Sequence, residues 1–122
     1  MVIIKNTKSE FSEQVILFKL LELESIREFK YIHAHLNGVK MSIRQALKAK
    51  MSGAKRGHPD ISWPLKRGSY SGLYIEMKFG KNKLTPEQIE YFDFVSEQGF
   101  KCLVCYSGRE AFQKIKDYYS LA

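Results

Sequence analysis

The sequence has little cysteine and no long apolar run, and each shortage excludes a class of protein. Two cysteines in 122 residues cannot supply the disulfide framework of a small secreted domain, and they indicate a reducing compartment. No apolar run approaches the roughly 20 residues that cross a membrane. The first ten residues, MVIIKNTKSE, lack a proper apolar region followed by a cleavage site, so we predict a cytoplasmic chain that is not secreted.

The sequence also lacks an internal repeat, a low-complexity tract and a linker. Its hydrophobic fraction of 44% and charged fraction of 27% are ordinary for a globular protein. At this length a chain can bury a core without disulfides or metals to stabilise it. We therefore predict a single domain over residues 1–122.

Acidic residues are scarce between Lys40 and Arg67, where Asp60 is the only one. The whole chain carries 20 Lys and Arg against 13 Asp and Glu, a net charge of +7. A local excess of cations favours polyanionic partners, because each neutralised phosphate releases condensed counterions. The segment predicts contact with nucleic acid, against the alternative that the charge only keeps the protein soluble.

Apolar periodicity and turn residues predict an α/β domain with a mixed central sheet. In the first helix, Phe11, Val15, Phe18 and Leu21 can line one face, and Thr7 with Glu10 fits a capping box. At the later helix, Thr85, Pro86 and Gln88 supply an N-cap, a proline at the first position and a capping-box partner. The predicted helices cover 9–25, 41–52, 85–98 and 109–119, and the predicted strands cover 29–36, about 60–63, the YIEMK stretch and 100–107.

The YIEMK stretch, residues 74–78, places an acid and a base inside an apolar strand. Side chains in a strand alternate between faces, so Glu76 and Lys78 project from the same side. Asp60, at the start of the preceding strand, is expected to lie close to Glu76 if the two strands pair antiparallel. Two neighbouring carboxylates repel unless a divalent cation is coordinated between them, so the pattern favours a metal site over a balanced surface pair.

These motifs resemble the VRR-NUC (virus-type replication-repair nuclease) branch of the PD-(D/E)xK nuclease superfamily. The resemblance rests on PD at 59–60, EMK at 76–78, HLNG at 35–38, the run LYIEMKFGKNKLTPEQIEYF and the αβββαβ order of elements. It spans about residues 10–119 and implies a restriction-endonuclease-like core. Asp60, Glu76, Lys78 and Gln88 match the family's catalytic positions.

The resemblance also implies a metal centre and a reaction. Mg²⁺ or Mn²⁺ would be held by Asp60, Glu76 and the backbone carbonyl of Met77, with a further glutamate from the first helix. Glu13 is the preferred candidate and Glu10 the alternative, because Glu10 already has a capping role in the predicted helix start and Glu13, followed by Gln14, matches the family's E-Q pair. Lys78 would orient the attacking water or stabilise the transition state. The implied reaction is metal-dependent hydrolysis of phosphodiester bonds in DNA.

The resemblance implies branched DNA as substrate and a homodimer as the acting species. Stand-alone members of this family resemble virus-encoded resolvases of four-way junctions. If this gene is viral, the expected location of the protein is the host cytoplasm. The alternatives are a flap- or nick-type nuclease, an RNA-processing nuclease, or a binding module that has lost the chemistry. The residues expected to contact DNA are Arg44, Lys48, Lys55, Arg56, His58, Lys81 and Lys83.

Other conspicuous residues have ordinary structural interpretations. Cys102 and Cys105 stand three positions apart in a predicted strand, so their thiols face opposite sides and cannot easily share a ligand. His33 and His35 share a strand face but have no third metal ligand at suitable spacing. Trp63 could stack on a base, although packing is the default for it.

Overall fold

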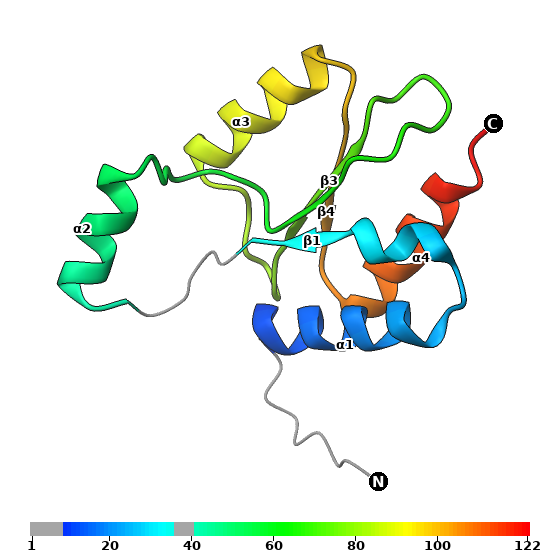
Figure 1. The fold of residues 1–122 in the computed structure, drawn as a ribbon, viewed down its shortest axis with the longest axis horizontal. Helices are drawn as coiled ribbons and strands as arrows, with labels where there is room; N and C mark the ends of the chain where they lie inside the picture. Colours follow the sequence, from blue (N-terminus) through cyan, green and yellow to red (C-terminus); the bar gives the residue numbers. More distant parts are fainter. Residues whose placement is uncertain (1–8, 36–40) are drawn as a thin grey trace, which may run out of the picture.

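The computed structural model describes residues 9–35 and 41–122, which contain one four-stranded sheet of order β1-β2-β3-β4 (Figure 1). β1 and β2 are antiparallel, as are β2 and β3, whereas β3 and β4 are parallel. The predicted α/β class with a mixed sheet is confirmed. The elements are α1 (Glu10–Leu23), η1 (Arg27–Tyr31), β1 (His33–Ala34), α2 (Ile43–Met51), β2 (Ile61–Trp63), β3 (Leu73–Met77), α3 (Pro86–Glu97), β4 (Lys101–Cys105) and α4 (Gly108–Tyr119).

One face of the sheet forms the main core with α1 and α4. Leu17 from α1, Ile75 and Met77 from β3, and Ile115 from α4 are all fully buried in one cluster. Each such side chain contributes about 1.5–3 kcal/mol by leaving water. α1 and α4 approach so closely that a side chain at Gly108 would collide with the backbone of α1.

The other face of β3 meets α3. Tyr74 makes an edge contact with Tyr91 on α3, with ring centroids 5.9 Å apart, and Phe92 and Val95 are buried on the same helix. Alternate residues of β3 therefore face different helices. Leu73, Ile75 and Met77 face the main core, whereas Tyr74 and Glu76 face α3.

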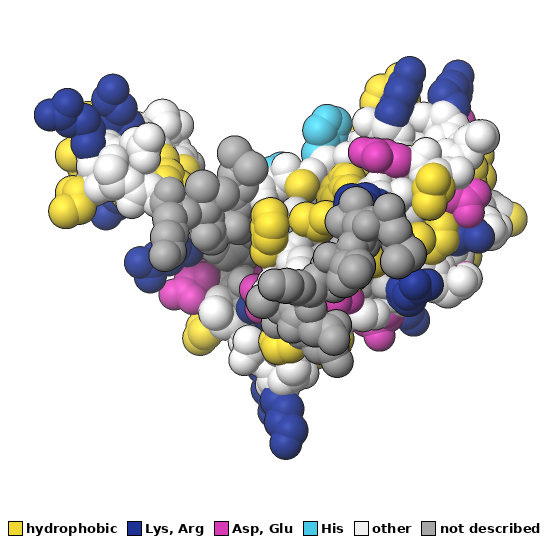
Figure 2. Space-filling model, turned by 90° about the horizontal axis from the view of Figure 1, so that it is seen from below, with side chains coloured by type: hydrophobic (Ala, Val, Ile, Leu, Met, Phe, Trp, Pro, Cys, Tyr) yellow, Lys and Arg dark blue, Asp and Glu magenta, His cyan; other side chains and the backbone are white. Residues whose placement is uncertain are grey.

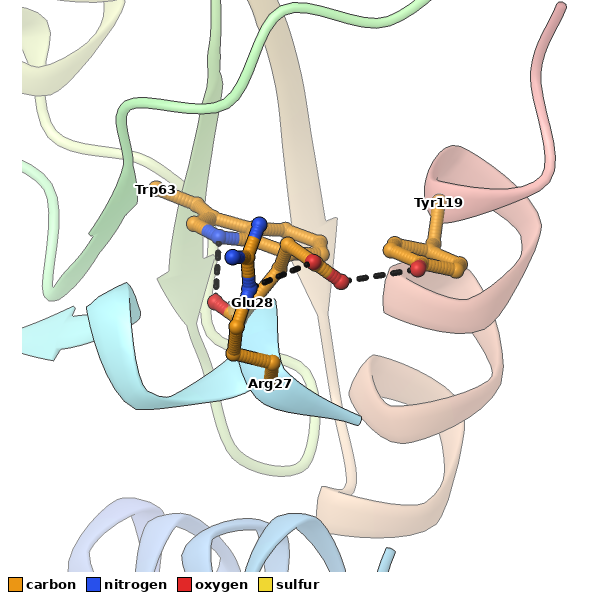
Figure 3. Close-up of polar contacts among 4 residues, drawn as sticks. All are labelled: Arg27, Glu28, Trp63 and Tyr119. Carbon is orange, nitrogen blue, oxygen red and sulfur yellow. Dashed lines mark hydrogen bonds and ion pairs between the residues drawn. The ribbon is translucent and has the colours of Figure 1, made fainter. Parts of the chain in front are cut away.

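An aromatic cluster ties η1 to β2 and α4 (Figure 3). The Trp63 indole donates its Nε1–H to the backbone carbonyl of Glu28 at 3.1 Å, and the Tyr119 hydroxyl donates to Glu28 Oε2 at 2.7 Å. Arg27 pairs with the other Glu28 oxygen at 3.2 Å. Trp63 and Tyr119 stack with centroids 6.2 Å apart, and Phe29 meets Trp63 edge-on.

This cluster overturns the predicted strand over 29–36. Residues 27–31 form a 3₁₀ helix instead, and among the described residues of that segment only His33 and Ala34 pair as a strand. The reason is tertiary: burying Phe29 against Trp63 and offering the Glu28 carbonyl to the indole require a tight turn. The predicted Asn37-Gly38 turn lies outside the described residues.

Two details of the first helix differ from the prediction. Ser9 is the N-cap and forms the capping box with Ser12, so Glu10 is not a capping partner; Thr7 lies outside the described residues. The helix buries Leu17 and Leu21, while Phe11 points outward. Phe11, Val15 and Phe18 do share one face of α1, as predicted. The fully buried residues are nevertheless Leu17 and Leu21, because α1 is apolar on two sides and periodicity cannot say which side meets the sheet.

The last strand also differs from its prediction. β4 is an edge strand in which only Cys105 is fully buried, so burial on both faces was wrong. The two thiols do face opposite sides: Cys105 lies in the main core, and Cys102 lies 3.9 Å from the carbonyl of Phe92 on α3. None of the helices within residues 9–35 and 41–122 has the length and apolarity that a membrane crossing requires.

Candidate active site

The β2/β3 register brings Asp60 beside Glu76. Ile61 lies opposite Ile75 in this antiparallel pair, so the residue before Ile61 falls next to the residue after Ile75. The side-chain carboxylate of Asp60 accepts a hydrogen bond from the Met77 N–H at 2.8 Å. The main-chain carbonyl of Asp60 accepts one from the His35 N–H at 2.7 Å. The predicted closeness of the two carboxyl groups is confirmed.

Glu76 is the most deeply buried acid of the site, with 4% of its surface exposed. Its Oε2 accepts a hydrogen bond from Gln88 Nε2 at 3.2 Å, while Oε1 is buried without a hydrogen-bond partner among the described residues. Burial, and then the neighbouring Asp60 carboxyl, raise the pKa of Glu76 to about 9, against the opposing charge of Lys78. A buried carboxyl oxygen of this kind is a donor that a hard cation could use.

Lys78 follows Glu76 by one pleat and is also buried, with 8% of its surface exposed. It lies just past the end of β3, where its N–H still pairs with the Cys105 carbonyl at 2.9 Å. Its charge favours ionised Glu76. The charge of Lys78 therefore acts on Glu76, as expected for an acid and a base on one face of this strand.

Gln88 joins the site to the start of α3. Its Oε1 accepts the Thr85 N–H at 2.9 Å, which closes the predicted capping box, and its Nε2 donates to Glu76. Capping alone would explain a glutamine here, so the bond to Glu76 is the additional finding. One amide thereby fixes the position of a helix end relative to a buried carboxyl group.

A cluster of rings lies beside Asp60 and was not singled out in the sequence. His58 contacts His35 with ring centroids 4.1 Å apart, Tyr91 at 5.1 Å and Tyr74 at 5.9 Å. Burial, with the neighbouring His58 and His33, lowers the pKa of His35. These aromatic residues come from four separate segments, so no spacing in the sequence could have grouped them.

The backbone next to this cluster packs tightly against α3. Gly57 has a φ of +94°, and a Cβ placed there would lie 2.7 Å from the Glu87 carbonyl oxygen. Only glycine combines that backbone conformation with that approach. The turn that presents Pro59 and Asp60 is therefore held against the same helix end that supplies Gln88.

The fold does not decide between the two candidate glutamates of α1. Glu13 Oε1 accepts the N–H of Gly108 at 2.8 Å and thus caps α4, while Glu10 is exposed at the first position of α1. Glu10 has no capping role, so the capping argument no longer favours Glu13, and only its match to the family's E-Q pair does. Across residues 9–35 and 41–122, no group of three or more His, Cys, Asp or Glu side chains forms a metal site.

The donors that do meet fit a hard divalent cation. Asp60 and Glu76 supply carboxylate oxygens, the type that Mg²⁺ and Mn²⁺ prefer, and such ions often complete their shell with water and substrate phosphate. The two histidines in and just after β1 do not add ligands to Asp60 and Glu76. His33 is exposed, and His35 Nε2 lies 3.0 Å from Ser62 Oγ.

The predicted DNA contacts lie around the site rather than in it. Arg44 and Lys48 are exposed on α2, which projects from the body, and Figure 2 shows Lys and Arg side chains gathered over that projection. His58 is half-buried in the ring cluster, and Trp63 is fully buried and so closed to base stacking. The remaining predicted contacts, Lys55, Arg56, Lys81 and Lys83, are exposed in turns.

A family model described as the VRR-NUC domain matches residues 3–109, most of the chain. The chain belongs to the VRR-NUC family. VRR-NUC membership gives it a nuclease-type function and confirms the resemblance carried by the PD and EMK motifs.

A solved structure described as a VRR_NUC domain protein has the same fold, with a TM-score of 0.79 and 27% sequence identity. The match covers 93% of this chain and 90% of that one, so the fold is shared over nearly its whole length. No curated protein matches the chain significantly.

Proposed function

We propose that this VRR-NUC protein is a metal-dependent DNA endonuclease that hydrolyses phosphodiester bonds. The observation that carries the proposal is the buried pair Glu76 and Lys78 next to half-buried Asp60, in which Glu76 Oε1 has no hydrogen-bond partner among the described residues. Burying an acid and a lysine costs folding free energy, and a function at this position would explain why both are kept there. Binding of nucleic acid alone does not need carboxylates next to phosphate, so catalysis explains this group better than binding.

Asp60 and Glu76 would hold Mg²⁺ or Mn²⁺, together with the backbone carbonyl of Met77 and a glutamate of α1, Glu13 or Glu10. Such an ion polarises the scissile phosphate and lowers the pKa of a bound water. The cation would also replace the proton that Glu76 otherwise retains at neutral pH. Asp60 is oriented for this by its bond from the Met77 N–H.

Lys78, just past the end of β3, and Gln88, on α3, would both act on the reacting groups. The Lys78 ammonium stabilises the negative charge that develops on the phosphate, or orients the attacking water. The Gln88 amide holds Glu76 Oε2 and so leaves Oε1 directed to the cation. Water is excluded by burial, which strengthens each of these interactions.

The exposed cations would bind the DNA backbone around this site. Lys81 and Lys83 follow β3 directly, and Lys55 and Arg56 precede the PD motif, so both pairs are close in sequence to catalytic residues. Arg44 and Lys48 on α2 extend the basic surface. We propose four-way junctions as substrate and a homodimer as the acting species, because two symmetric sites suit a symmetric junction.

The test is cleavage of labelled four-way junction, flap, single-stranded and plain duplex DNA, with RNA as a further arm. We expect cutting with Mg²⁺ or Mn²⁺, none with EDTA, and the fastest cutting on the junction. Lys78→Ala and Glu76→Gln should each lower the rate by at least about 100-fold. Lys114→Ala, an exposed lysine on α4, is the matched control and should cut as wild type does.

Failure to cut any substrate with metal would refute the enzyme, and so would full activity in Lys78→Ala. Cutting of RNA alone would reassign the substrate. Preference for flaps over junctions would remove the resolvase part and leave the metal chemistry intact.

A further inference from the structure

The loop between β3 and α3 carries cations and no acid (Figure 1). Its residues 79–84 read FGKNKL and follow directly after Lys78. Lys81 and Lys83 are exposed, whereas Lys78 is buried in the candidate active site. The loop thus leads from a residue of the proposed chemistry to two proposed contacts with the DNA backbone. Where those contacts lie relative to Lys78 depends on what holds the loop.

Packing does little to hold this loop. The Asn82 N–H donates to the Phe79 carbonyl at 3.1 Å and closes a turn, in which Gly80 has a φ of +62°. A Cβ placed at Gly80 would meet nothing within 4 Å, so the turn stands in open space. Of residues 79–84 only Phe79 and Leu84 are partly buried. A hydrogen bond from outside the loop can therefore decide where it lies.

Tyr106 supplies such a bond. Its hydroxyl donates to the Asn82 carbonyl at 3.1 Å, across 24 positions of sequence. Within residues 9–35 and 41–122, no other hydrogen bond joins residues 79–84 to another part of the chain. The Tyr106 side chain is 41% exposed, so burial of the ring does not account for its place beside the loop.

Tyr106 is itself fixed at the end of the sheet that carries Lys78. β3 and β4 are parallel with Met77 opposite Cys105, so Lys78 and Tyr106 follow their strands at the same end. The Lys78 N–H donates to the Cys105 carbonyl at 2.9 Å, and the Tyr106 N–H donates to Glu110 Oε1 at 2.8 Å. The loop is thereby held at its start by the sheet and near its far end by the Tyr106 hydroxyl.

We propose that Tyr106 is a positioning residue for DNA binding: through Asn82 it holds Lys81 and Lys83 at a fixed place beside Lys78. A loop that is ordered in advance loses less conformational freedom when phosphates bind, so the same two charges bind more tightly. The inference rests on the DNA contacts proposed for Lys81 and Lys83 and not on the cleavage chemistry. Tyr106 itself adds no charge, which separates its role from that of the lysines.

Limited digestion with trypsin tests whether the hydroxyl holds the loop. Initial rates of cutting after Lys81 and Lys83, mapped by mass spectrometry, should rise at least about threefold in Tyr106→Phe, because the loop opens more often. Cutting after Lys114 on α4 reports unfolding of the whole protein and should keep its wild-type rate. Tyr31→Phe changes another exposed tyrosine and is the matched control, with all rates unchanged. Unchanged loop rates, or an equal rise at Lys114, overturn the proposal.

A double-mutant cycle tests whether the position of the loop matters for DNA. Dissociation constants are measured in EDTA by fluorescence anisotropy with labelled four-way junction and duplex DNA. Tyr106→Phe should raise the constant at least about threefold when Lys81 and Lys83 are present, and leave it unchanged when both are alanine. A general loss of stability would act equally in both backgrounds. An equal loss in both, or no loss in the first, overturns the proposal.

These measurements need no cleavage, so this inference and the nuclease proposal can fail separately. A protein that shows the coupling but cuts no DNA would refute the nuclease alone, whereas cleavage by a wild-type protein without the coupling would refute only the role of Tyr106. Where DNA is cut, Tyr106→Phe should raise KM at least about threefold and leave kcat within about twofold. A lower kcat at unchanged KM would contradict a role in binding.

Discussion

Glu76 holds its proton at neutral pH because its surroundings offer little to stabilise the charge. Burial and the Asp60 carboxyl raise its pKa to about 9, and the nearby Lys78 charge offsets only part of that rise. In the protein without metal, the ionised form is therefore unfavourable. A cation at this position would compensate the charge, which links metal binding to proton release.

The first prediction concerns the pH dependence of stability in EDTA. The folded state binds the Glu76 proton more tightly than the unfolded chain, whose ordinary pKa is 4.5, so stability from this group is lost as pH rises from about 5 to about 9. The melting temperature of wild type should fall further over this range than that of Glu76→Gln. Mg²⁺ at pH 8 should raise the wild-type value and leave the variant unchanged. If the melting temperatures of wild type and Glu76→Gln change in parallel with pH, Glu76 does not have the raised pKa on which this prediction depends.

Gln88 allows its two roles to be separated by substitution. Gln88→Glu can keep the bond to the Thr85 N–H, because glutamate also closes a capping box, but it cannot donate to Glu76. We expect its cleavage rate to fall at least about tenfold while helix capping is retained. Thr85→Ala is the counterpart: it should cost about 1 kcal/mol of unfolding free energy and retain cleavage.

Cleavage rates and urea denaturation of both variants provide the measurement. Equal loss of activity in Thr85→Ala and Gln88→Glu would mean that Gln88 acts only through the position of α3. Gln88→Ala, which removes both bonds, should combine the two effects.

At the scale of elements, the start of α3 was the easiest feature to predict and the aromatic turn the hardest. Thr85, Pro86 and Gln88 act through bonds within one turn, so local sequence suffices to place the start of α3. η1 depends on Trp63 and Tyr119, which are remote in sequence. Its aromatic and branched residues have strand propensity, which the tertiary contacts overrode.

Trp63→Phe tests how much this cluster contributes to η1 and the fold. Trp63 is 1% exposed, so the change leaves a void and an unpaired Glu28 carbonyl, and it should lower the free energy of unfolding by about 2 kcal/mol. Tyr119→Phe removes only the hydroxyl that donates to Glu28, and its effect should be smaller. Urea denaturation measures both, and the reverse order would show that the hydroxyl, not the indole, holds η1.

At the scale of the whole molecule, the net charge of +7 governs binding to DNA. Each phosphate neutralised by Lys or Arg steepens the fall of affinity with salt by about 0.9 in a plot of log K against log salt. Replacing Lys81 and Lys83 by alanine should therefore reduce this slope by about 2. Fluorescence anisotropy in EDTA measures binding without cleavage.

Replacing Arg109 and Lys114, both exposed on α4, by alanine removes the same two charges and is the control; it should leave the slope near the wild-type value. An unchanged slope in the double variant would place Lys81 and Lys83 outside the DNA contact. An equal reduction in the control would show that only total charge matters.

By itself the sequence determined the fold class, the start of α3 and the closeness of Asp60 to Glu76. Those depend on alternation, capping and charge, which act over a few residues. Tertiary structure decided which side of α1 is buried, that Glu13 caps α4, and that Gln88 reaches Glu76. These outcomes depend on packing between elements far apart in the chain, where side chains compete for space and partners. Such competition is settled only once the sheet and its helices have come together.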